Sequence, residues 1–265
     1  MYSEKEHTWS ICAYGESAYL EEAICSVLKQ TISTKVIMVT STPNTYIQDL
    51  AGKYKLPLYI NEGEKGIAND WNFAYQKADT KLVTLCHQDD IYEETYIENM
   101  LQHLNKKEKT LIAFSDYGEV RDGNKILKNK LLKIKRILLF PLKFSFLQQS
   151  VWIRRRCLSL GNCICCPAVT YVKENLPERI FFEKYKSNVD WQTWEAISKQ
   201  KGSFLFVPKI LMYHRIHQES TTTEIIGESL RTKEDYEMFL KFWPKWIAKK
   251  ISKIYQSSEN SNQIN

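Results

Sequence analysis

The first ninety residues alternate between short apolar runs and segments of helical periodicity, and this alternation strongly limits the possible folds. Apolar runs at 8–13, 35–40, 58–61 and 82–86 predict strands, and the segments 20–28, 44–54 and 67–78 between them predict helices. Strands separated by helices at this interval indicate βαβ units and a mainly parallel sheet. The chain therefore belongs to the α/β class.

Past residue 90 the pattern is mixed. It predicts strands at 111–117, 204–207 and 210–213 and a helix at 191–199. We expect one α/β domain over 1–225, with a nucleotide-binding half at 1–120 and a second half at 121–225. A basic helical extension follows at 226–265, and we expect its tail after Ser257 to be disordered.

The fourth apolar run, Leu82 to Cys86, leads within three residues to two adjacent carboxylates, Asp89 and Asp90. A buried parallel strand would deliver them to its carboxyl end, where open α/β sheets bind ligands. One interpretation is that a divalent cation lies between these carboxylates and a phosphate. The other is a polar turn that caps a helix starting near Glu93.

The charge of the chain is uneven. The formal net charge is +6 over 265 residues, yet residues 121–156 alone carry eleven basic residues against one acid, Asp122. The seven cysteines follow no spacing typical of zinc sites. No apolar run approaches the length that spans a bilayer, and the N-terminal segment is polar. These features predict a cytoplasmic protein with reduced, buried cysteines.

Several motifs occur in an order that resembles the family 2 glycosyltransferases. Residues 11–16 and 19–31 resemble the family's first strand and helix, and residues 61–72 resemble its glycine loop and Asn-bearing helix. His87-Gln88-Asp89-Asp90 stands in the place of its Asp-x-Asp-Asp metal motif. Asp190-Trp191 stands where the family has its catalytic base, and Tyr213 to Thr222 resembles its Arg-x-His-x-x-Ser segment. The match spans roughly residues 8 to 225, and each piece alone would be weak.

The resemblance implies a GT-A fold and inverting, metal-dependent transfer of a sugar from a nucleotide-diphosphate sugar to a glycan or lipid-linked acceptor. Asp89 is then the metal ligand for Mn²⁺ or Mg²⁺, and Asp90 orients it or contacts the donor sugar. Asp190 is the general base that takes the proton of the acceptor hydroxyl. Without the resemblance, Asp190 is better explained as an N-cap or first-turn residue of its helix.

The resemblance also implies donor-binding residues. Ala13, Tyr14 and Glu16 would lie near the nucleobase and ribose, and Gly66 and Asn69 near the donor. Arg215 would reach the diphosphate, and His217 would be a further metal ligand or a phosphate donor. The alternatives are that Tyr14 packs on a helix, that Gly66 only forms a turn, and that His217 is exposed to solvent.

Two departures from the family pattern stand out. The second strand usually ends in acidic residues that contact the base, whereas Val39 to Pro43 supplies only hydroxyls. His87 replaces the first aspartate of the metal motif. This either alters the metal preference, since imidazole suits Mn²⁺ better than Mg²⁺, or leaves metal binding to Asp89 alone.

The basic segments 125–143 and 241–253 mix cations with apolar residues, a pattern that fits helices on an anionic membrane surface. A solvated basic face is the alternative. No nucleic-acid motif accompanies the charge, so we expect no nucleic-acid partner. The resemblance implies lipid-linked acceptors, and these favour peripheral association of the protein with the inner face of the membrane.

Three other functions remain open. A non-catalytic GT-A-fold partner in a glycan-assembly complex is favoured by His87 and the missing second-strand acids. A nucleotidyltransferase would need a glycine-rich and basic triphosphate loop after the first strand, which Tyr14 to Ser17 does not supply. A membrane-surface protein without an active site is the third.

Overall fold

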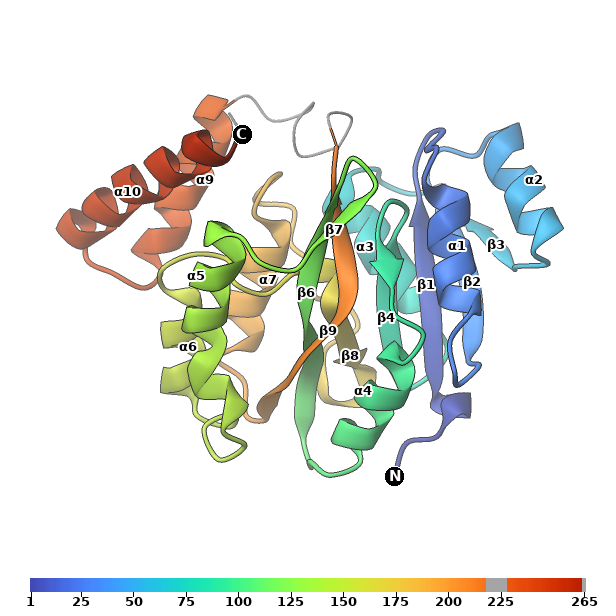
Figure 1. Cartoon of the computed structure of the whole chain (residues 1–265), viewed down its shortest axis with the longest axis horizontal. Coiled ribbons are helices and arrows are strands. Elements are labelled where there is room, and N and C mark those ends of the chain that lie inside the picture. Colours follow the sequence, from blue (N-terminus) through green and yellow to red (C-terminus); the bar gives the residue numbers. More distant parts are fainter. Residues whose placement is uncertain (218–227, 264–265) are drawn as a thin grey trace.

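Within residues 1–217 and 228–263, which this computed structural model describes, a nine-stranded sheet runs through the centre of the molecule (Figure 1). Its order is β3-β2-β1-β4-β8-β6-β9-β5, and β7 pairs with β6. The strand bounds are β1 (His7–Ala13), β2 (Lys35–Thr40), β3 (Leu58–Ile60), β4 (Leu82–His87), β5 (Ile91–Tyr92), β6 (Thr110–Arg121), β7 (Asn124–Ile126), β8 (Val169–Val172) and β9 (Ser203–Ile216).

The amino-terminal half of the sheet is parallel, as the alternation of strands and helices predicts. β1 pairs in parallel with both β2 and β4, and β2 pairs in parallel with β3. β8 then joins the two halves, because it is antiparallel to both β4 and β6. β6 and β9 pair in parallel along almost their whole length. The α/β class and the mainly parallel sheet are confirmed.

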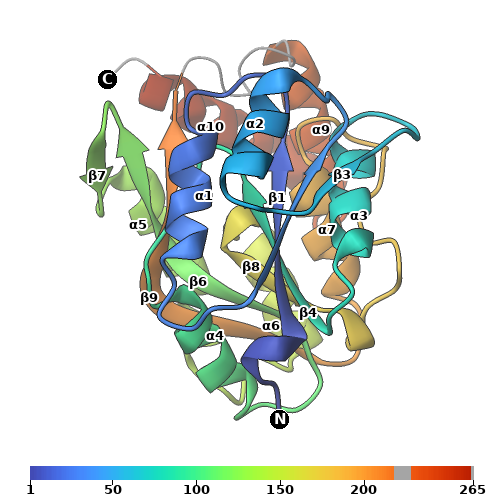
Figure 2. The same ribbon diagram turned by 90° about the vertical axis from the view of Figure 1, so that its right-hand side faces the viewer.

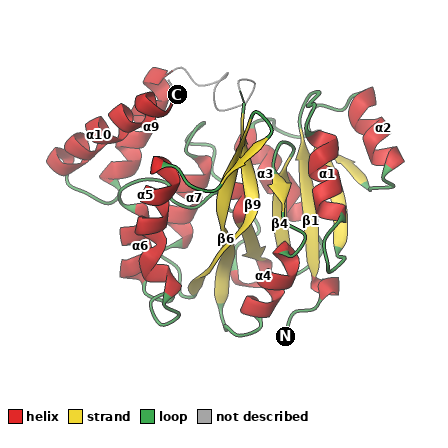
Figure 3. Cartoon of the chain, viewed as in Figure 1, coloured by secondary structure: helices red, strands yellow, loops and turns green. Residues whose placement is uncertain are grey.

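Helices cover both faces of the sheet (Figures 2 and 3). One face carries α1 (Leu20–Leu28), α2 (Thr45–Lys53) and α4 (Tyr96–Leu104), which share a core with Trp9 and Ile11. The opposite face carries α3 (Ile67–Lys77), α6 (Val151–Leu158) and α7 (Val189–Ile197) around Phe114 and Tyr171. α5 (Lys130–Leu139) contributes Leu132 to the first core and Leu139 to the second.

The carboxyl-terminal helices α9 (Glu228–Leu240) and α10 (Lys245–Gln263) lie beside α7, at the end of the molecule opposite α2 and β3 (Figure 1). The rings of Phe239 and Tyr255 pack against Trp191 of α7, with centroid distances of 5.1 Å and 6.2 Å. The helical extension is therefore anchored to the core. α10 continues to Gln263, and the disorder expected after Ser257 stays a prediction.

Three other differences from the sequence analysis concern elements. The helix expected near Glu93 begins at Tyr96, and the short strand β5 precedes it. The two strands expected at 204–207 and 210–213 form one strand, β9, which is bent where its register with β6 shifts. β8 and α6 lie in a region for which the sequence predicted no regular element.

Candidate active site

β4 carries the acidic motif to the carboxyl edge of the parallel strands. Leu82 to Cys86 are fully buried, and Cys12 of β1 lies opposite His87 in the register. Gln88, Asp89 and Asp90 form the turn that follows, before β5. The carboxylates thus emerge at the edge where open α/β sheets bind ligands, as the sequence predicts.

Asp90 is completely buried, and one of its oxygens ties the turn to β9. Its Oδ1 accepts hydrogen bonds from His214 Nδ1 (2.9 Å) and from the backbone N–H of Arg215 (3.0 Å). Burial alone would lower the pKa of His214, but the Asp90 carboxylate outweighs it and raises that pKa to about 9. His214 is therefore a cation at neutral pH. The polar turn is present, but Thr95 and not Asp89 or Asp90 is the N-cap of α4, so the capping part of that alternative was wrong.

Asp89 is the second acid of the turn. His217 Nε2 lies 3.1 Å from its Oδ2, and its backbone carbonyl accepts from Arg215 Nε (2.9 Å). Burial opposes ionisation, but the hydrogen bond from His217 and the nearby imidazoles of His214 and His87 hold the pKa of Asp89 below its ordinary value. Asp89 is therefore ionised and available as a ligand.

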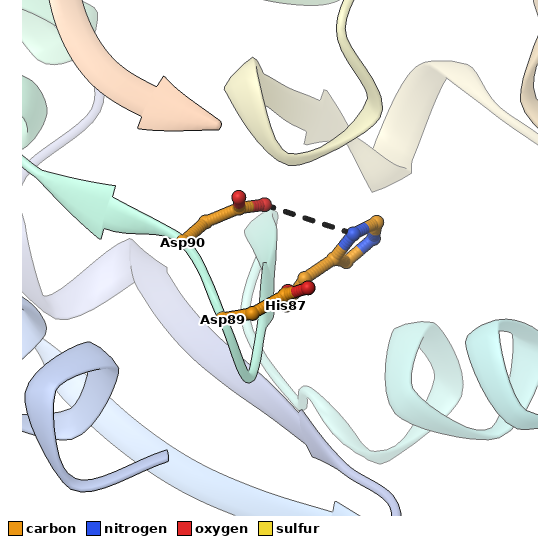
Figure 4. Close-up of side chains that lie close together, drawn as sticks. All are labelled: His87, Asp89 and Asp90. Carbon is orange, nitrogen blue, oxygen red and sulfur yellow. Dashed lines mark ion pairs between the residues drawn. The ribbon is translucent and has the colours of Figure 1, made fainter. Parts of the chain in front are cut away.

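The residues present fit a divalent cation. One ligand atom each from His87, Asp89 and Asp90 lies within 4.8 Å of the others. Figure 4 shows the three side chains converging, with His87 Nδ1 3.8 Å from Asp90 Oδ2. Among the described residues, His87 Nε2 and Asp90 Oδ2 are buried without a hydrogen-bond partner. Such orphaned atoms are costly unless something else binds them, and a cation would do so.

His87 is fixed in this group by an aromatic neighbour. Its ring stacks on Trp71 of α3 at a centroid distance of 5.0 Å. A mixed imidazole and carboxylate set suits Mn²⁺ better than Mg²⁺. His217 contacts Asp89 but lies outside the group of three.

Arg215 is buried and already engaged. Besides its bond to the Asp89 carbonyl, its Nη2 pairs with Glu22 of α1, and its guanidinium lies 4.3 Å from the centre of the Tyr19 ring. It thereby joins β9, α1 and the acidic turn. The predicted contact of Arg215 with a diphosphate stays a prediction, and its observed contacts hold Asp89 in position.

Asp190 lies in the first turn of α7, half-buried. Its Oδ1 accepts from the N–H of Trp191 (2.7 Å) and its Oδ2 from Asn162 Nδ2 (2.6 Å). Burial raises the pKa of Asp190, and the bond from Asn162 only partly offsets this. Lys135 and the imidazole of His87 also act to lower the pKa of Asp190, so it shares the electrostatic environment of the acidic turn. Its position matches the first-turn interpretation and leaves the role of base open.

The expected donor residues lie around the end of β1. Ala13 is its last residue, and the backbone N–H of the exposed Tyr14 donates to Gln88 Oε1 (2.8 Å), which links this loop to the acidic turn. Glu16 is exposed. Gly66 precedes α3 with φ of +120°, a conformation that favours glycine, so the turn interpretation is sufficient there.

Asn69 and Asp70 differ in their contacts. Asn69 Oδ1 accepts from Arg179 (2.6 Å). Asp70, which the sequence analysis did not select, accepts from Ser41 Oγ (3.0 Å) and from Asn61 Nδ2 (2.8 Å). A carboxylate from α3 therefore stands at the ends of β2 and β3, where the second strand itself has only hydroxyls.

Sequence reasoning also missed His214, Glu22 and Asn162. His214 directly precedes Arg215 in a segment that the sequence analysis had selected, so its place was readable. Glu22 and Asn162 carried no signal, because a helix surface and an irregular loop gave no reason to prefer them. Gln218 to Thr222, the last part of the segment that resembles the family, lie outside the described residues.

This fold and this acidic edge define a class. Residues 8–163 match the model of glycosyl transferase family 2, which is more than half of the chain. The chain belongs to glycosyl transferase family 2, and its fold is that of the GT-A glycosyltransferases.

Three relatives show how far the likeness extends. An uncharacterized glycosyltransferase of Haemophilus influenzae is 23% identical over 234 residues, which cover 80% of this chain and 66% of that protein. The structure resembles residues 1–349 of S. aureus TarS in complex with UDP-GlcNAc (TM-score 0.64, 14% identity, 93% of this chain and 70% of that one). It also resembles the mannosyltransferase PcManGT of Pyrobaculum calidifontis in complex with GDP-Man and Mn²⁺ (TM-score 0.62, 14% identity, 95% and 70%).

Proposed function

We propose that the protein is an inverting, metal-dependent glycosyltransferase that moves a sugar from a nucleotide-diphosphate sugar to a glycan or lipid-linked acceptor in polysaccharide assembly. The observation that carries the proposal is the group of His87, Asp89 and Asp90, with two buried polar atoms that lack a hydrogen-bond partner among the described residues, at the carboxyl edge of the sheet. The nucleotide-sugar complexes of TarS and PcManGT support it. We place the reaction in the cytoplasm, at the inner face of a membrane.

Asp89 is the principal metal ligand, with His87 and Asp90 beside it and His217 in contact with Asp89. A bound Mn²⁺ or Mg²⁺ would supply Lewis-acid stabilisation of the charge on the leaving diphosphate. Arg215 keeps Asp89 in place through the backbone carbonyl. His214 holds Asp90 so that its Oδ2 stays directed toward His87.

Asp190 is the general base in this proposal. Inversion in a single displacement needs one base and no covalent sugar intermediate. The Asn162 amide holds one carboxylate oxygen by a hydrogen bond. The raised pKa makes the Asp190 carboxylate a stronger base, as a general base near neutral pH requires.

The nucleobase lies, in this proposal, near Ala13, Tyr14 and Glu16. Asp70 replaces the acidic residues that the second strand lacks. Ser41 and Asn61 hold its carboxylate by hydrogen bonds. In this proposal the carboxylate accepts a hydrogen bond from the ring N–H of a base in which that N–H lies beside a carbonyl, such as uracil, thymine or guanine. Gly66 and Asn69 remain candidate donor contacts.

The test is a panel of uridine, thymidine and guanosine diphosphate sugars with Mn²⁺, in which released nucleotide and transferred sugar are measured. Asp190→Asn should lower transfer by about 10²- to 10⁴-fold, because a positioned base contributes a factor of that size. Binding of the nucleoside diphosphate, measured by calorimetry, should remain near that of the parent. Asp49→Asn, at an exposed aspartate on α2, is the matched control and should change neither quantity.

The alternative is a non-catalytic GT-A-fold partner in a glycan-assembly complex, which the replacement of the first motif aspartate by His87 favours. The same panel separates the two. Metal-dependent nucleotide binding with turnover supports the enzyme. A folded protein that releases nucleotide from no donor supports the partner, and full transfer by Asp190→Asn removes Asp190 from the role of base.

A further inference from the structure

The segment from α5 to α6 exposes positive charge without compensating acids. No aspartate or glutamate occurs between Asp122 and Glu174. Some of its cations serve the fold, since Arg136 pairs with Asp116, Arg155 pairs with Glu195, and Arg154 is buried against backbone carbonyls. Four exposed lysines have no ion pair among the described residues: Lys128, Lys130, Lys133 and Lys143. The charge of these four lysines is therefore not neutralised by a neighbouring acid.

Large apolar side chains stand exposed among these lysines. Phe146 is 76% exposed, Trp152 64%, Ile137 62% and Phe140 54%. The Phe144 ring packs between those of Phe140 and Phe146, with centroid distances of 5.6 Å and 6.1 Å. The ammonium group of Lys143 lies over the Phe140 ring. These aromatics therefore form one cluster. We define the basic aromatic face as Lys128, Lys130, Lys133, Ile137, Phe140, Lys143, Phe144, Phe146 and Trp152.

The lysines and the apolar residues share one side of α5. Lys130, Lys133, Ile137 and Phe140 follow the spacing of one helical face. A groove of about 890 Å³ is lined by six residues of the basic aromatic face together with Asn129 and Arg136. Lys135, on the other side of the helix, donates to the hydroxyl of the buried Tyr117 (2.8 Å). The exposed side of α5 is thus distinct from the side that packs on the protein.

The face continues through α6 toward the start of α10. The Arg156 guanidinium lies over Trp152 (5.7 Å) and over Trp243 (4.7 Å). Trp243 is fixed to the protein, since its indole N–H donates to the carbonyl of Ser159 (2.7 Å). Three residues later, Trp246 is 66% exposed beside Lys250. Of the predicted membrane segment 241–253, the exposed part is therefore Trp246 and its neighbouring lysines.

We propose that the basic aromatic face docks on an anionic lipid bilayer. Unpaired lysines are attracted to the surface charge of anionic lipids, and exposed Phe and Trp rings bury their apolar bodies at the headgroup boundary. Nucleic acid would explain the lysines, and bases stack on exposed aromatic rings, but it would not explain the exposed aliphatic side chain of Ile137 beside them. Among the described residues, no helix combines the length and the apolar character needed to cross a bilayer. This docking is peripheral and goes beyond the proposed catalysis.

The test is co-sedimentation of the full chain with vesicles of phosphatidylcholine alone and of phosphatidylcholine with 30 mol% phosphatidylglycerol, taking that fraction as roughly that of an anionic leaflet. The protein should bind the anionic vesicles and lose binding as salt rises. Lys130→Ser with Lys133→Ser should weaken binding by roughly 25-fold, since each lysine near the surface contributes about fivefold. Phe146→Ser with Trp152→Ser should weaken it at every salt concentration.

Leu28→Ser with Lys29→Ser, at exposed positions of the α1 end, is the matched control and should leave vesicle binding unchanged. Donor hydrolysis in solution should be the same for all these variants, so loss of vesicle binding is separate from loss of catalysis. Equal binding to neutral and anionic vesicles, no binding to either, or no effect of the variants on the face would overturn the proposal. Retention on RNA without vesicle binding would also overturn it.

Discussion

Asp190 shows how one side chain combines a fold-related and a chemical requirement. Its first-turn position places the carboxylate beside the N–H of Trp191, which favours the charged form, while burial favours the neutral form. Burial is the stronger effect, so the pKa lies above the ordinary value of about 3.9. A base must be deprotonated to act, so activity falls as the pH drops through this raised pKa.

This gives a testable pH profile. The acid limb of kcat/KM should lie above pH 4, roughly the ordinary aspartate pKa. Asn162→Ala removes a hydrogen bond to the carboxylate and should move the limb further up. Stability should respond with the opposite sign: because the folded state holds this proton more tightly than the unfolded chain, protonation of Asp190 stabilises the fold as pH falls. An acid limb that stays in place in Asn162→Ala would contradict the assignment.

For His87, the sequence predicted the position in the motif but not the residues that it contacts. Its place in the motif was readable, but its partners were not, because the stacking ring of Trp71 comes from α3 and the unpaired oxygen from Asp90. The sequence predicted either a change in metal preference at this position or metal binding by Asp89 alone. The structure adds that the imidazole is partly buried and that its buried Nε2 has no hydrogen-bond partner among the described residues.

At the scale of elements, the end of β9 holds the acidic turn. It supplies His214 to Asp90 and Arg215 to Asp89, and its pairing with β5 fixes the backbone that follows the turn. The alternation of a strand sends these two neighbouring side chains in different directions. His214 thus reaches the Asp90 carboxylate, whereas Arg215 reaches the backbone carbonyl of Asp89.

The Arg215 contacts predict the outcome of Arg215→Lys. Lysine cannot reproduce the fork that joins the Asp89 carbonyl to Glu22, so stability should fall by about 2 kcal/mol and metal-dependent nucleotide affinity should fall with it. Glu22→Gln, on the exposed side of the pair, should cost less than about 1 kcal/mol. Denaturant unfolding and calorimetry measure the two quantities. A loss of nucleotide affinity with unchanged stability would instead mean that Arg215 contacts the diphosphate.

Local patterns predicted the elements of the amino-terminal half closely, and they failed in the carboxyl-terminal half for a physical reason. β1 and β4 are buried on both faces, and all four strands β1 to β4 read as apolar runs between amphipathic helices. β8 is only four residues long, and its position between β4 and β6 depends on pairing with strands distant in the chain. The likewise distant contacts of Asn162 and Asp70 could not be found from periodicity.

At the scale of the whole molecule, the acidic turn, α1 and β9 meet at one edge, so a ligand there should stabilise the entire fold. With Mn²⁺ and a nucleoside diphosphate at one hundred times its Kd, linkage predicts about 2.7 kcal/mol. For a chain of this size that corresponds to a rise in Tm of roughly 5 to 10 °C. Thermal unfolding with nucleotide alone, metal alone and both measures it. Asp89→Asn should abolish the joint effect, and an undiminished rise would contradict the role of Asp89.

The parallel pairing of β6 with β9 has a consequence for how the chain folds. Thr110 lies opposite Ser203, so β6 leaves the ribosome long before its partner exists. Until then its hydrogen-bonding edge is open, and such edges promote aggregation. A shortened chain that ends before Ser203 should therefore be poorly soluble even though it contains the complete acidic motif. Folding that waits for a distant partner should also be slow, so the sheet is completed only after Ser203 to Ile216 have been synthesised.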